Sequence, residues 1–381
     1  PVHPATMPLL PSILAPGIAI LSQIHLTTLW AGYGSIHRLS LRLPSSPHSS
    51  PPSSIILKVI TPPQHSSADI PDEGHLRKLI SYAAESWFYN NLSQRLNRVY
   101  AEVGGRGPKV AEAYQDLVRS GNPAMAAMGG MILALEDLKI KFPYNVGYVD
   151  SLSHAQAVIR WLARFHAGFM HCGEDEVPGL PPPMLAKSDD SGAYTGVWRQ
   201  GSYWYLATRR SEYEDMVSSG EWGWLEPWVE YVDKKLWPES PSGDDVEPAS
   251  HLGRTILHGD TKAANILFTK PITGNNHSYS VSRAGGSESD VEAALYDFQY
   301  VGHGLGAVDL VYFLATSVGL YRTEMVYWQR YYYDEVVAAV EELGLEGGVR
   351  GWTWDVFRRQ FNWAVVDWCR FGAGWGGWGN W

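Results

Sequence analysis

The loop sequence HGDTKAAN, residues 258–265, constrains this chain more than any other feature. An apolar run at 266–268 follows the loop, and a second acidic residue, Asp297, ends a later apolar run. Phosphoryl transfer from a magnesium-bound nucleotide needs such a set, because one carboxylate orients the attacking hydroxyl while an amide and another carboxylate hold the metal ions. We predict Asp260 as the hydroxyl-orienting carboxylate, with Asn265 and Asp297 as metal ligands. The alternative is a chance turn followed by a strand-end cap, which the complete spacing disfavours.

Lys262 follows Asp260 on the same loop, where its ammonium would face the negative charge that develops on a transferring phosphoryl group. We predict a catalytic role for Lys262, and the alternative is a solvated loop lysine. His258 and Gly259 are predicted to shape the loop rather than to react, because a histidine beside a turn glycine is often a packed support. Asp309 is predicted either to cap a later helix or to bind the backbone of this loop.

The first part of the chain holds a candidate phosphate-binding turn. Residues 26–43 contain two β-rich runs separated by small residues, which predicts a hairpin. Gly32, Gly34 and Ser35 lie at this turn and could let backbone amides approach phosphates. Two glycines in a hairpin are a weak signal alone, and it is their position before Lys58 that favours a nucleotide site.

Lys58 is the only charge in the short apolar strand predicted at residues 55–60. An unpaired ammonium in a buried strand would be costly, so Lys58 requires a partner. Glu85, on a helix predicted over residues 76–97, is the candidate. A strand lysine held by a helix glutamate can position the α and β phosphates of a nucleotide. The alternative is a lysine that reaches solvent from the strand end and a glutamate on a wet helix face.

A boundary between two lobes is predicted after the buried strand at residues 131–135. With 381 residues the chain exceeds what one hydrophobic core usually covers. We predict a nucleotide-binding lobe at residues 1–137 and a catalytic and substrate-binding lobe at residues 138–381. By position, Leu135 and Glu136 are predicted to contact adenine through their backbone.

Charge and cysteine content exclude several classes of function. The formal net charge is −10, which opposes a role that depends on binding nucleic-acid phosphates. Only Cys172 and Cys369 are present, so no disulfide framework is predicted and a cytoplasmic location is the simplest expectation. The apolar segment at residues 7–21 is interrupted by prolines and is too short for a membrane span; we expect it to pack on the first lobe.

The chain resembles the protein-kinase-like small-molecule phosphotransferases, which include aminoglycoside phosphotransferases and choline kinases, and it is most similar to the ecdysteroid-kinase-like (CHK kinase-like) group. Five segments carry the resemblance: LEDL at 135–138, LARFHA at 162–167, HGDTKAANILF at 258–268, YDFQ at 296–299 and DLVYFL at 309–314.

This resemblance implies an α+β, two-lobed protein-kinase-like fold with a β-rich N-lobe and a mainly helical C-lobe. It implies ATP and Mg²⁺ in the cleft between the lobes, with Asp260 as catalytic base, Asn265 and Asp297 as magnesium ligands and Lys58 on the phosphates. Two positions depart from related patterns. Gln299 stands where protein kinases have glycine, and Lys262 stands where the ecdysteroid-kinase-like group often has tryptophan.

The acceptor is predicted to be a small-molecule alcohol of the choline, aminoglycoside or sterol-like class. One hypothesis is an aromatic pocket for a cationic or flat alcohol, and the favoured alternative is that most of the rings are helix-packing core. A pseudokinase without turnover is a second interpretation of the whole chain. A protein kinase is a third, disfavoured because no Ala-Pro-Glu segment follows Asp297. The tryptophans considered for the pocket are Trp198, Trp204, Trp222, Trp224, Trp228, Trp352, Trp354, Trp363 and Trp368.

Overall fold

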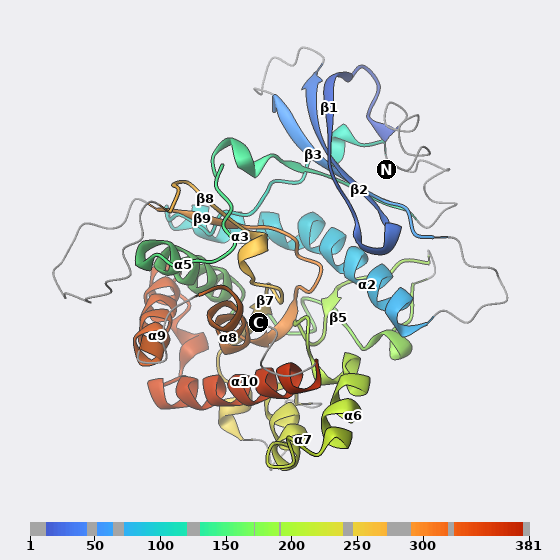
Figure 1. The fold of residues 1–381 in the computed structure, drawn as a ribbon. Helices are drawn as coiled ribbons and strands as arrows, with labels where there is room; N and C mark the ends of the chain where they lie inside the picture. Colours follow the sequence, from blue (N-terminus) through green and yellow to red (C-terminus); the bar gives the residue numbers. More distant parts are fainter. Residues whose placement is uncertain are drawn as a thin grey trace.

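The computed structural model combines an N-terminal β-sheet with a larger helical region (Figure 1), which confirms the predicted α+β class. In the view of Figure 1 the sheet lies at the top, helix α2 runs beneath it, and the C-terminal helices lie below. The structure describes residues 13–43, 52–63, 72–119, 130–170, 172–189, 192–238, 247–272, 291–318 and 324–375.

Four antiparallel strands form the N-terminal sheet in the order β1-β2-β3-β4. Alternate residues of β2 are buried, as expected for a strand with one face on a core. The predicted hairpin is present, although its first strand begins earlier than the predicted range. The strands are β1 (Ala19–Thr28), β2 (Gly34–Arg42), β3 (Ser54–Ile60) and β4 (Met131–Glu136).

The helix predicted over residues 76–97 is present as three consecutive helical segments. They are α2 (Glu73–Trp87), a π-helical stretch (Phe88–Leu92) and α3 (Ser93–Glu102). The Asp72 carboxylate caps the first of them by accepting from the backbone N–H of His75 at 2.6 Å.

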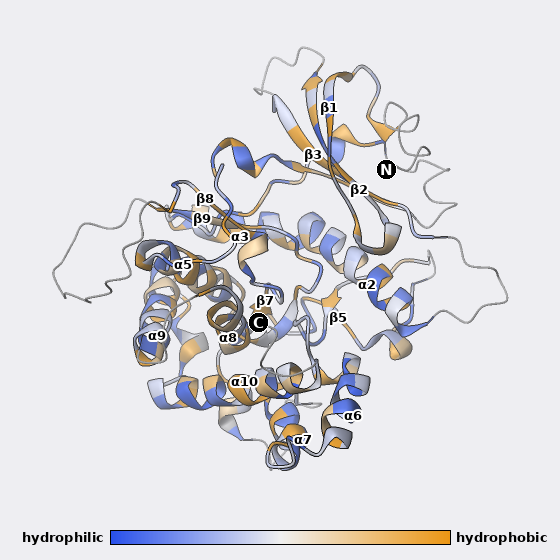
Figure 2. Cartoon of the chain, viewed as in Figure 1, coloured by the Kyte–Doolittle hydropathy of each residue, from blue (hydrophilic) through white to orange (hydrophobic). Residues whose placement is uncertain are grey.

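The helical region packs around one large apolar cluster to which α5, α8, α9 and α10 all contribute. Figure 2 shows hydrophilic and hydrophobic residues alternating along α9 and α10, as expected for helices with one buried face. The helices are α5 (Leu152–Phe169), α6 (Arg210–Ser219), α7 (Glu226–Leu236), α8 (Ala307–Ser317), α9 (Met325–Glu342) and α10 (Trp354–Gly374).

Two small sheets flank the loop HGDTKAAN. One has the order β5-β6-β10-β7, and the other is the antiparallel pair β8-β9, which was predicted. The loop runs from the end of β7 to the start of β8, so strands hold it on both sides. Most of the polar insertion between β8 and β9 lies outside the described residues. The strands are β5 (Gly179–Leu180), β6 (Val197–Trp198), β7 (Arg254–Leu257), β8 (Ile266–Phe268), β9 (Ala293–Leu295) and β10 (Gly302–Leu305).

The main apolar cluster crosses the predicted lobe boundary at residue 137. Phe88 and Leu133 from before the boundary belong to the same cluster as Leu162 from after it, so the two residue ranges stay a prediction. Ile13 and Leu14, at the start of the described chain, pack in the core of the N-terminal sheet, as expected for the early apolar segment. Within the described ranges, no helix has the length and apolar character needed to cross a membrane.

Candidate active site

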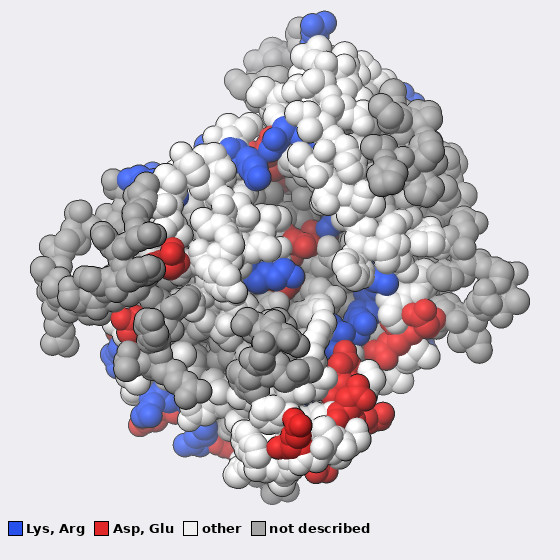
Figure 3. All heavy atoms as spheres, viewed as in Figure 1, with Lys and Arg blue, Asp and Glu red and all other residues white. Residues whose placement is uncertain are grey.

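A cleft with a volume of about 960 Å³ lies between the N-terminal sheet and the helical region. Figure 3 shows this face of the molecule hollowed, with acidic and basic side chains within and beside the hollow. The cleft therefore brings together segments that are far apart in the sequence. Of the predicted site residues, it is lined by Lys58, Glu85, Leu135, Glu136, Asp260, Lys262 and Asp297.

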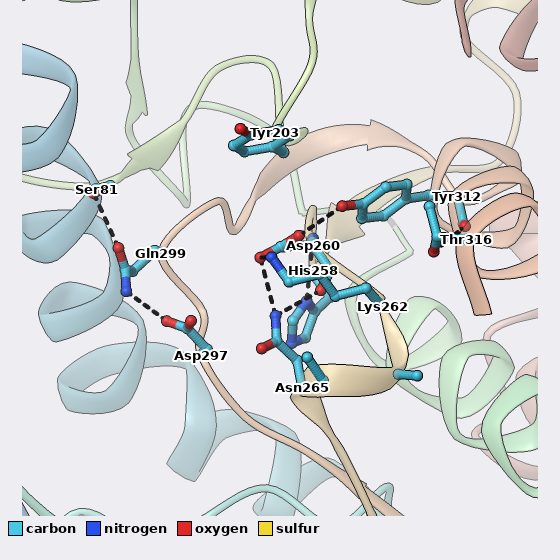
Figure 4. A network of polar contacts seen from close by, with 12 residues as sticks. Ser81, Tyr203, His258, Asp260, Lys262, Asn265, Asp297, Gln299, Tyr312 and Thr316 are labelled. Atoms are coloured by element: carbon cyan, nitrogen blue, oxygen red, sulfur yellow. Dashed lines mark hydrogen bonds and ion pairs between the residues drawn. The ribbon is translucent and has the colours of Figure 1, made fainter. Parts of the chain in front are cut away.

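The carboxylate of Asp260 is buried and held by three side-chain donors (Figure 4). Its Oδ1 accepts from the hydroxyl of Tyr312 at 3.0 Å, and its Oδ2 accepts from Nζ of Lys262 at 2.9 Å and Nδ2 of Asn265 at 3.0 Å. A carboxylate held in this way keeps a single orientation toward the cleft. Sequence analysis missed Tyr312. It could have been found from its position three residues after Asp309, because residues with this spacing lie on the same face of a helix.

Asp309 holds the backbone of the loop at residues 258–265, as predicted. Its fully buried carboxylate accepts from the backbone N–H of His258 at 2.7 Å and of Gly259 at 2.9 Å. Gly259 has a φ of 81°, and a Cβ there would lie 2.1 Å from the carbonyl oxygen of Tyr300. Only glycine fits this close approach. The other prediction for Asp309, helix capping, is wrong, because Gly306 occupies the cap position.

His258 supports the loop without facing the cleft. Its Nε2 lies 3.1 Å from the carbonyl of Tyr296, and its Nδ1 lies 3.3 Å from the backbone N–H of Asp260. These partners require a neutral ring with the proton on Nε2. Burial lowers the pKa of His258 in spite of the nearby carboxylates, which agrees with the neutral form.

Asp297 adopts a left-handed backbone conformation, with a φ of 70°. This conformation is uncommon for a residue other than glycine and is retained where the surroundings impose it. The next residue, Phe298, is fully buried and stacks on Phe88 at a ring distance of 4.0 Å. The anchored ring thus fixes Asp297, whose side chain remains 30% exposed.

Two neighbours keep the Asp297 carboxylate ionised. Its Oδ1 accepts from Nε2 of Gln299 at 2.6 Å and lies 3.4 Å from Nζ of Lys58. Burial would raise the pKa of Asp297, but the Lys58 ammonium and the Gln299 hydrogen bond outweigh burial and lower it. Gln299 also accepts from Ser81 of α2 at 3.4 Å, so the residue that replaces glycine braces Asp297 against the helix (Figure 4).

The predicted pairing of Lys58 with Glu85 is present. Nζ of Lys58 lies 2.6 Å from Oε2 of Glu85, and both side chains are almost fully buried. Burial alone would lower the pKa of Lys58, but the charges of Glu85 and Asp297 reverse the shift and raise it. The ammonium is therefore charged and directed into the cleft. Its role in nucleotide binding stays a prediction.

Asn265 is buried at the end of the loop and does not line the cleft with the other predicted residues. Its Nδ2 donates to the backbone carbonyl of Asp260 at 2.9 Å as well as to the carboxylate. The amide oxygen is left free of these contacts and is turned to the side of Asp297 in Figure 4. This orientation fits a metal ligand, because amide and carboxylate oxygens both suit Mg²⁺.

Protein side chains alone offer few metal ligands here. Across the parts of the chain that the structure describes, no group of three or more His, Cys, Asp or Glu residues is suited to hold a metal ion. A magnesium ion held by Asn265 and Asp297 would take its other ligands from phosphates and water, as Mg²⁺ commonly does with nucleotides. The donor set therefore fits a metal that arrives with its nucleotide.

Lys262, on the loop at residues 258–265, lines the cleft. Its side chain is 41% exposed, and its Nζ lies 5.8 Å above the ring of Tyr203. Burial would lower the pKa of Lys262, but the charge and hydrogen bond of Asp260 raise it. A charged ammonium beside Asp260 is consistent with the predicted catalytic role.

The turn residues predicted to contact phosphates do not line the cleft. Gly32 is exposed, and the hydroxyl of Ser35 is buried and bonded to Nε2 of His37 at 2.7 Å. Gly34 meets a packing requirement instead, because a Cβ there would lie 2.0 Å from the carbonyl oxygen of Val59 on the next strand. The hairpin residues that do line the cleft are Leu26, Thr27, Thr28, Leu29, Trp30, Ile36 and Arg38.

Leu135 and Glu136 line the cleft at the end of β4, as predicted. The backbone N–H of Glu136, however, donates to the carbonyl of Glu112 at 2.8 Å. This N–H is therefore engaged within the protein and is not open to an adenine ring, which corrects that part of the prediction. The Glu136 carboxylate is paired with Lys109 at 2.5 Å.

None of the tryptophans considered for an aromatic pocket lines the cleft. Trp198 and Trp204 are fully buried in the core, whereas Trp224 and Trp228 are 64% and 55% exposed outside the cleft. The alternative that most of these rings are packing elements is therefore correct. Sequence analysis missed three aromatic residues that line the same cleft as Asp260, namely Tyr203, Tyr300 and Trp375.

Comparison with known proteins identifies structural relatives only. No protein-family model matches the chain, and no curated protein matches it. Several small-molecule kinases are among the solved structures that resemble it. A microcompartment-associated aminopropanol kinase is 13% identical, with a TM-score of 0.38 and coverage of 94% of this chain and 93% of that one.

Two further solved structures belong to the same class. The GDP and kanamycin complex of APH(2")-IIia is 10% identical, with a TM-score of 0.42 and coverage of 96% of this chain and 98% of that one. Choline kinase LicA from Streptococcus pneumoniae is 12% identical, with a TM-score of 0.38 and coverage of 93% of this chain and 94% of that one. Likenesses this low carry no argument on substrate, and the closer similarity to the ecdysteroid-kinase-like group stays a prediction.

Proposed function

We propose that this protein is an ATP-dependent phosphotransferase that moves the γ-phosphate of Mg-ATP to a hydroxyl group of a small molecule. One observation carries the proposal: the charged end of the Lys58–Glu85 pair, the ionised Asp297 and the oriented Asp260 all face one cleft, although they come from distant parts of the chain. Phosphoryl transfer depends on positioning and on charge stabilisation, and this set supplies both.

Each residue has a distinct task in this proposal. Lys58, held by Glu85, binds the α and β phosphates, while the amide oxygen of Asn265 and the carboxylate of Asp297 hold magnesium. When bound, Mg-ATP supplies the phosphoryl group and the metal charge that offsets its negative oxygens. Lys262 adds a second positive charge where the transferred group leaves ADP.

Asp260 orients the acceptor hydroxyl and takes its proton. Oδ2 already accepts from two donors and Oδ1 from Tyr312 alone, so the open lone pair is on Oδ1. The acceptor hydroxyl therefore approaches on the Oδ1 side. Its oxygen forms a bond to the γ-phosphorus as the bond to the β-γ bridging oxygen breaks, ADP departs, and the proton moves to Oδ1.

The direct test is a substrate search. The protein is incubated with Mg-ATP and a metabolite extract, and products heavier by one phosphoryl group are sought by mass spectrometry. We expect such a product with the wild-type protein and its loss in Asp260→Asn. Asp334→Asn is the matched control, because Asp334 is exposed on α9, pairs with Arg330 and does not line the cleft. A product that persists in Asp260→Asn contradicts the assigned role.

Two rival functions give different results. A pseudokinase would show a magnesium-dependent thermal shift with ATP but no ATP consumption in any extract. A protein kinase would transfer radiolabel from ATP to added proteins and to no small molecule. A cytoplasmic location goes with the proposed function, because both cysteines are free thiols.

A further inference from the structure

Two arginines from different parts of the chain meet at the cleft wall formed by α2 and the segment before α6. Arg77 lies on α2, and its Nη1 donates to the carbonyl of Thr208 at 2.9 Å. Arg209 is the next residue along, and its Nη2 donates to the carbonyl of Tyr203 at 2.8 Å. Both side chains line the same cleft as Asp260. The cleft therefore carries a pair of neighbouring guanidinium groups.

The carboxylates that line the cleft are already matched by other cations. Glu85 and Asp297 pair with Lys58, and Asp260 pairs with Lys262. At the far end of the cleft, the carboxylates of Glu136 and Asp137 each have a basic partner of their own. Charge neutralisation of the two arginines therefore has to come from elsewhere.

The arginine pair has little neutralising charge within the protein. Nη1 of Arg209 lies 3.5 Å from a Glu212 oxygen, at the edge of ion-pair distance. Among the described residues, no carboxylate forms an ion pair with Arg77. Among the described residues, a single ion pair, from Arg209 to Glu212, therefore offsets two positive charges. Side by side and partly desolvated, such charges are costly unless an anion joins them.

Aromatic rings hold the Arg209 guanidinium in place. It lies 4.5 Å from the ring centre of Tyr203, 5.7 Å from that of Trp375 and 5.9 Å from that of Phe371, and the residue is only 4% exposed. Burial and the charge of Arg77 lower the pKa of Arg209. Nε and Nη2 of Arg209 both donate to the carbonyl of Tyr203, at 3.1 and 2.8 Å, which leaves the remaining N–H groups of this rigid, dry guanidinium as donors for a carboxylate or phosphate.

Tyr203 connects this pair to the catalytic loop. The same ring that lies under Arg209 also lies 5.8 Å from Nζ of Lys262, which is bonded to Asp260. Figure 4 shows Tyr203 facing Asp260 across the open space of the site. One small molecule can therefore present a hydroxyl to Asp260 and an acidic group to the arginines.

We propose that Arg77 and Arg209 form an anion subsite for the acceptor, which is an alcohol that also carries a carboxylate or phosphate group. This inference rests on the proposed function and narrows it to anionic acceptors. It also replaces the expectation of a cationic acceptor, because the wall facing Asp260 presents guanidinium groups where a cationic molecule needs carboxylates.

Charge fractionation of the metabolite extract tests the substrate class. The extract is separated into anion-exchange-retained, cation-exchange-retained and unretained fractions, and each is incubated with the protein and Mg-ATP. We expect the phosphorylated product in the anion-retained fraction. Its appearance only in a cation-retained or unretained fraction overturns the anion subsite while leaving the phosphotransferase proposal intact. If no fraction yields a product although ATP binds, the proposed phosphotransferase function is contradicted. The sulfate-binding test below then decides by itself whether the anion subsite exists.

Sulfate serves as the probe in the binding test. It is titrated onto the protein saturated with Mg-AMP-PNP, and binding is followed by calorimetry. We expect saturable binding that is weakened about tenfold or more in Arg77→Gln and largely kept in Arg77→Lys, since a buried hydrogen bond to a charged group contributes about 1.5–3 kcal/mol. Equal binding by wild type and Arg77→Gln, or no binding by wild type, overturns the subsite.

Two controls distinguish sulfate binding at the arginine pair from a general loss of positive charge and from an effect on nucleotide binding. Arg210→Gln removes the neighbouring arginine, which is exposed and pairs with Glu230 at 2.6 Å outside the cleft, and it should leave sulfate binding unchanged. AMP-PNP affinity is measured in the same variants. A loss of AMP-PNP affinity in Arg77→Gln that matches the loss of sulfate binding assigns the arginines to the nucleotide phosphates and overturns an acceptor subsite.

Discussion

The hydroxyl of Tyr312 donates a hydrogen bond of 3.0 Å to Oδ1 of Asp260, and this bond joins helix α8 to the proposed catalytic carboxylate. The same helix carries Asp309, one turn away, which binds the backbone of the loop at residues 258–265. Helix α8 thus positions both the backbone and the side chain of the loop. Most of its residues are buried, so the helix is a rigid support for the site.

Replacing Tyr312 with phenylalanine should lower kcat with little effect on ATP affinity. The substitution removes one donor from Asp260 but leaves the ring packed against Trp204. Since a hydrogen bond to a charged group contributes about 1.5–3 kcal/mol, we expect kcat to fall about tenfold or more. Tyr331→Phe is the control, because Tyr331 accepts from Arg160 outside the cleft. An unchanged kcat in Tyr312→Phe would show that Asp260 is oriented without this bond.

Asp309→Asn should destabilise the folded protein. The carboxylate accepts from two backbone N–H groups and lies 3.1 Å from Nε2 of His166, whose Nδ1 lies 2.7 Å from the hydroxyl of Tyr332. An asparagine offers one acceptor and a clashing NH₂ group in a fully buried position. We expect the free energy of unfolding to fall by about 3–5 kcal/mol in denaturant titration. A fall below about 1 kcal/mol would contradict the importance of this network.

Lys58→Met should weaken nucleotide binding about tenfold or more, because it removes the charge proposed to contact the phosphates and leaves Glu85 and Asp297 unpaired. Calorimetric titration with Mg-AMP-PNP measures the effect. Lys235→Met is the matched control, since Lys235 pairs with Glu247 at 3.3 Å and does not line the cleft. Equal nucleotide affinity in wild type and Lys58→Met would place the phosphates elsewhere.

His258 should make stability depend on pH near neutrality. The unfolded chain binds a proton at this histidine near the ordinary pKa of about 6.5, whereas burial lowers the pKa in the folded protein. The unfolded state therefore binds more protons in this window, so the contribution of His258 is complete above about pH 6.5 and is lost as the pH falls.

The measurement compares wild type with His258→Gln between pH 7.5 and 5.5. Protonation of Nδ1 would remove the acceptor that His258 offers to the backbone N–H of Asp260. We expect the free energy of unfolding to fall more steeply with decreasing pH in wild type than in His258→Gln. Parallel curves for the two proteins would show that another group governs the pH dependence.

Much of the site is predictable from local sequence. The loop from His258 to Asn265 carries its own turn glycine and its candidate site residues close together in sequence, so its proposed role can be inferred without a structure. Lys58 is predictable for a different reason. A charge inside a buried apolar strand requires a partner, and Glu85 is the acidic residue within the helix predicted over residues 76–97.

Other features were decided only by the tertiary structure. No local sequence pattern predicts that Arg77 lies near Arg209, because their proximity depends on how α2 packs against the segment before α6. Similarly, Gly34 lies in a glycine-containing turn of the kind that can bind phosphates. In the structure a glycine is needed there because strand β3 lies too close to leave room for a side chain. Short-range sequence determines which groups a loop can present, whereas contacts between distant segments arise from the packing of whole elements. For this protein, the sequence alone determined the chemistry of the loop, and the fold decided what faces it across the cleft.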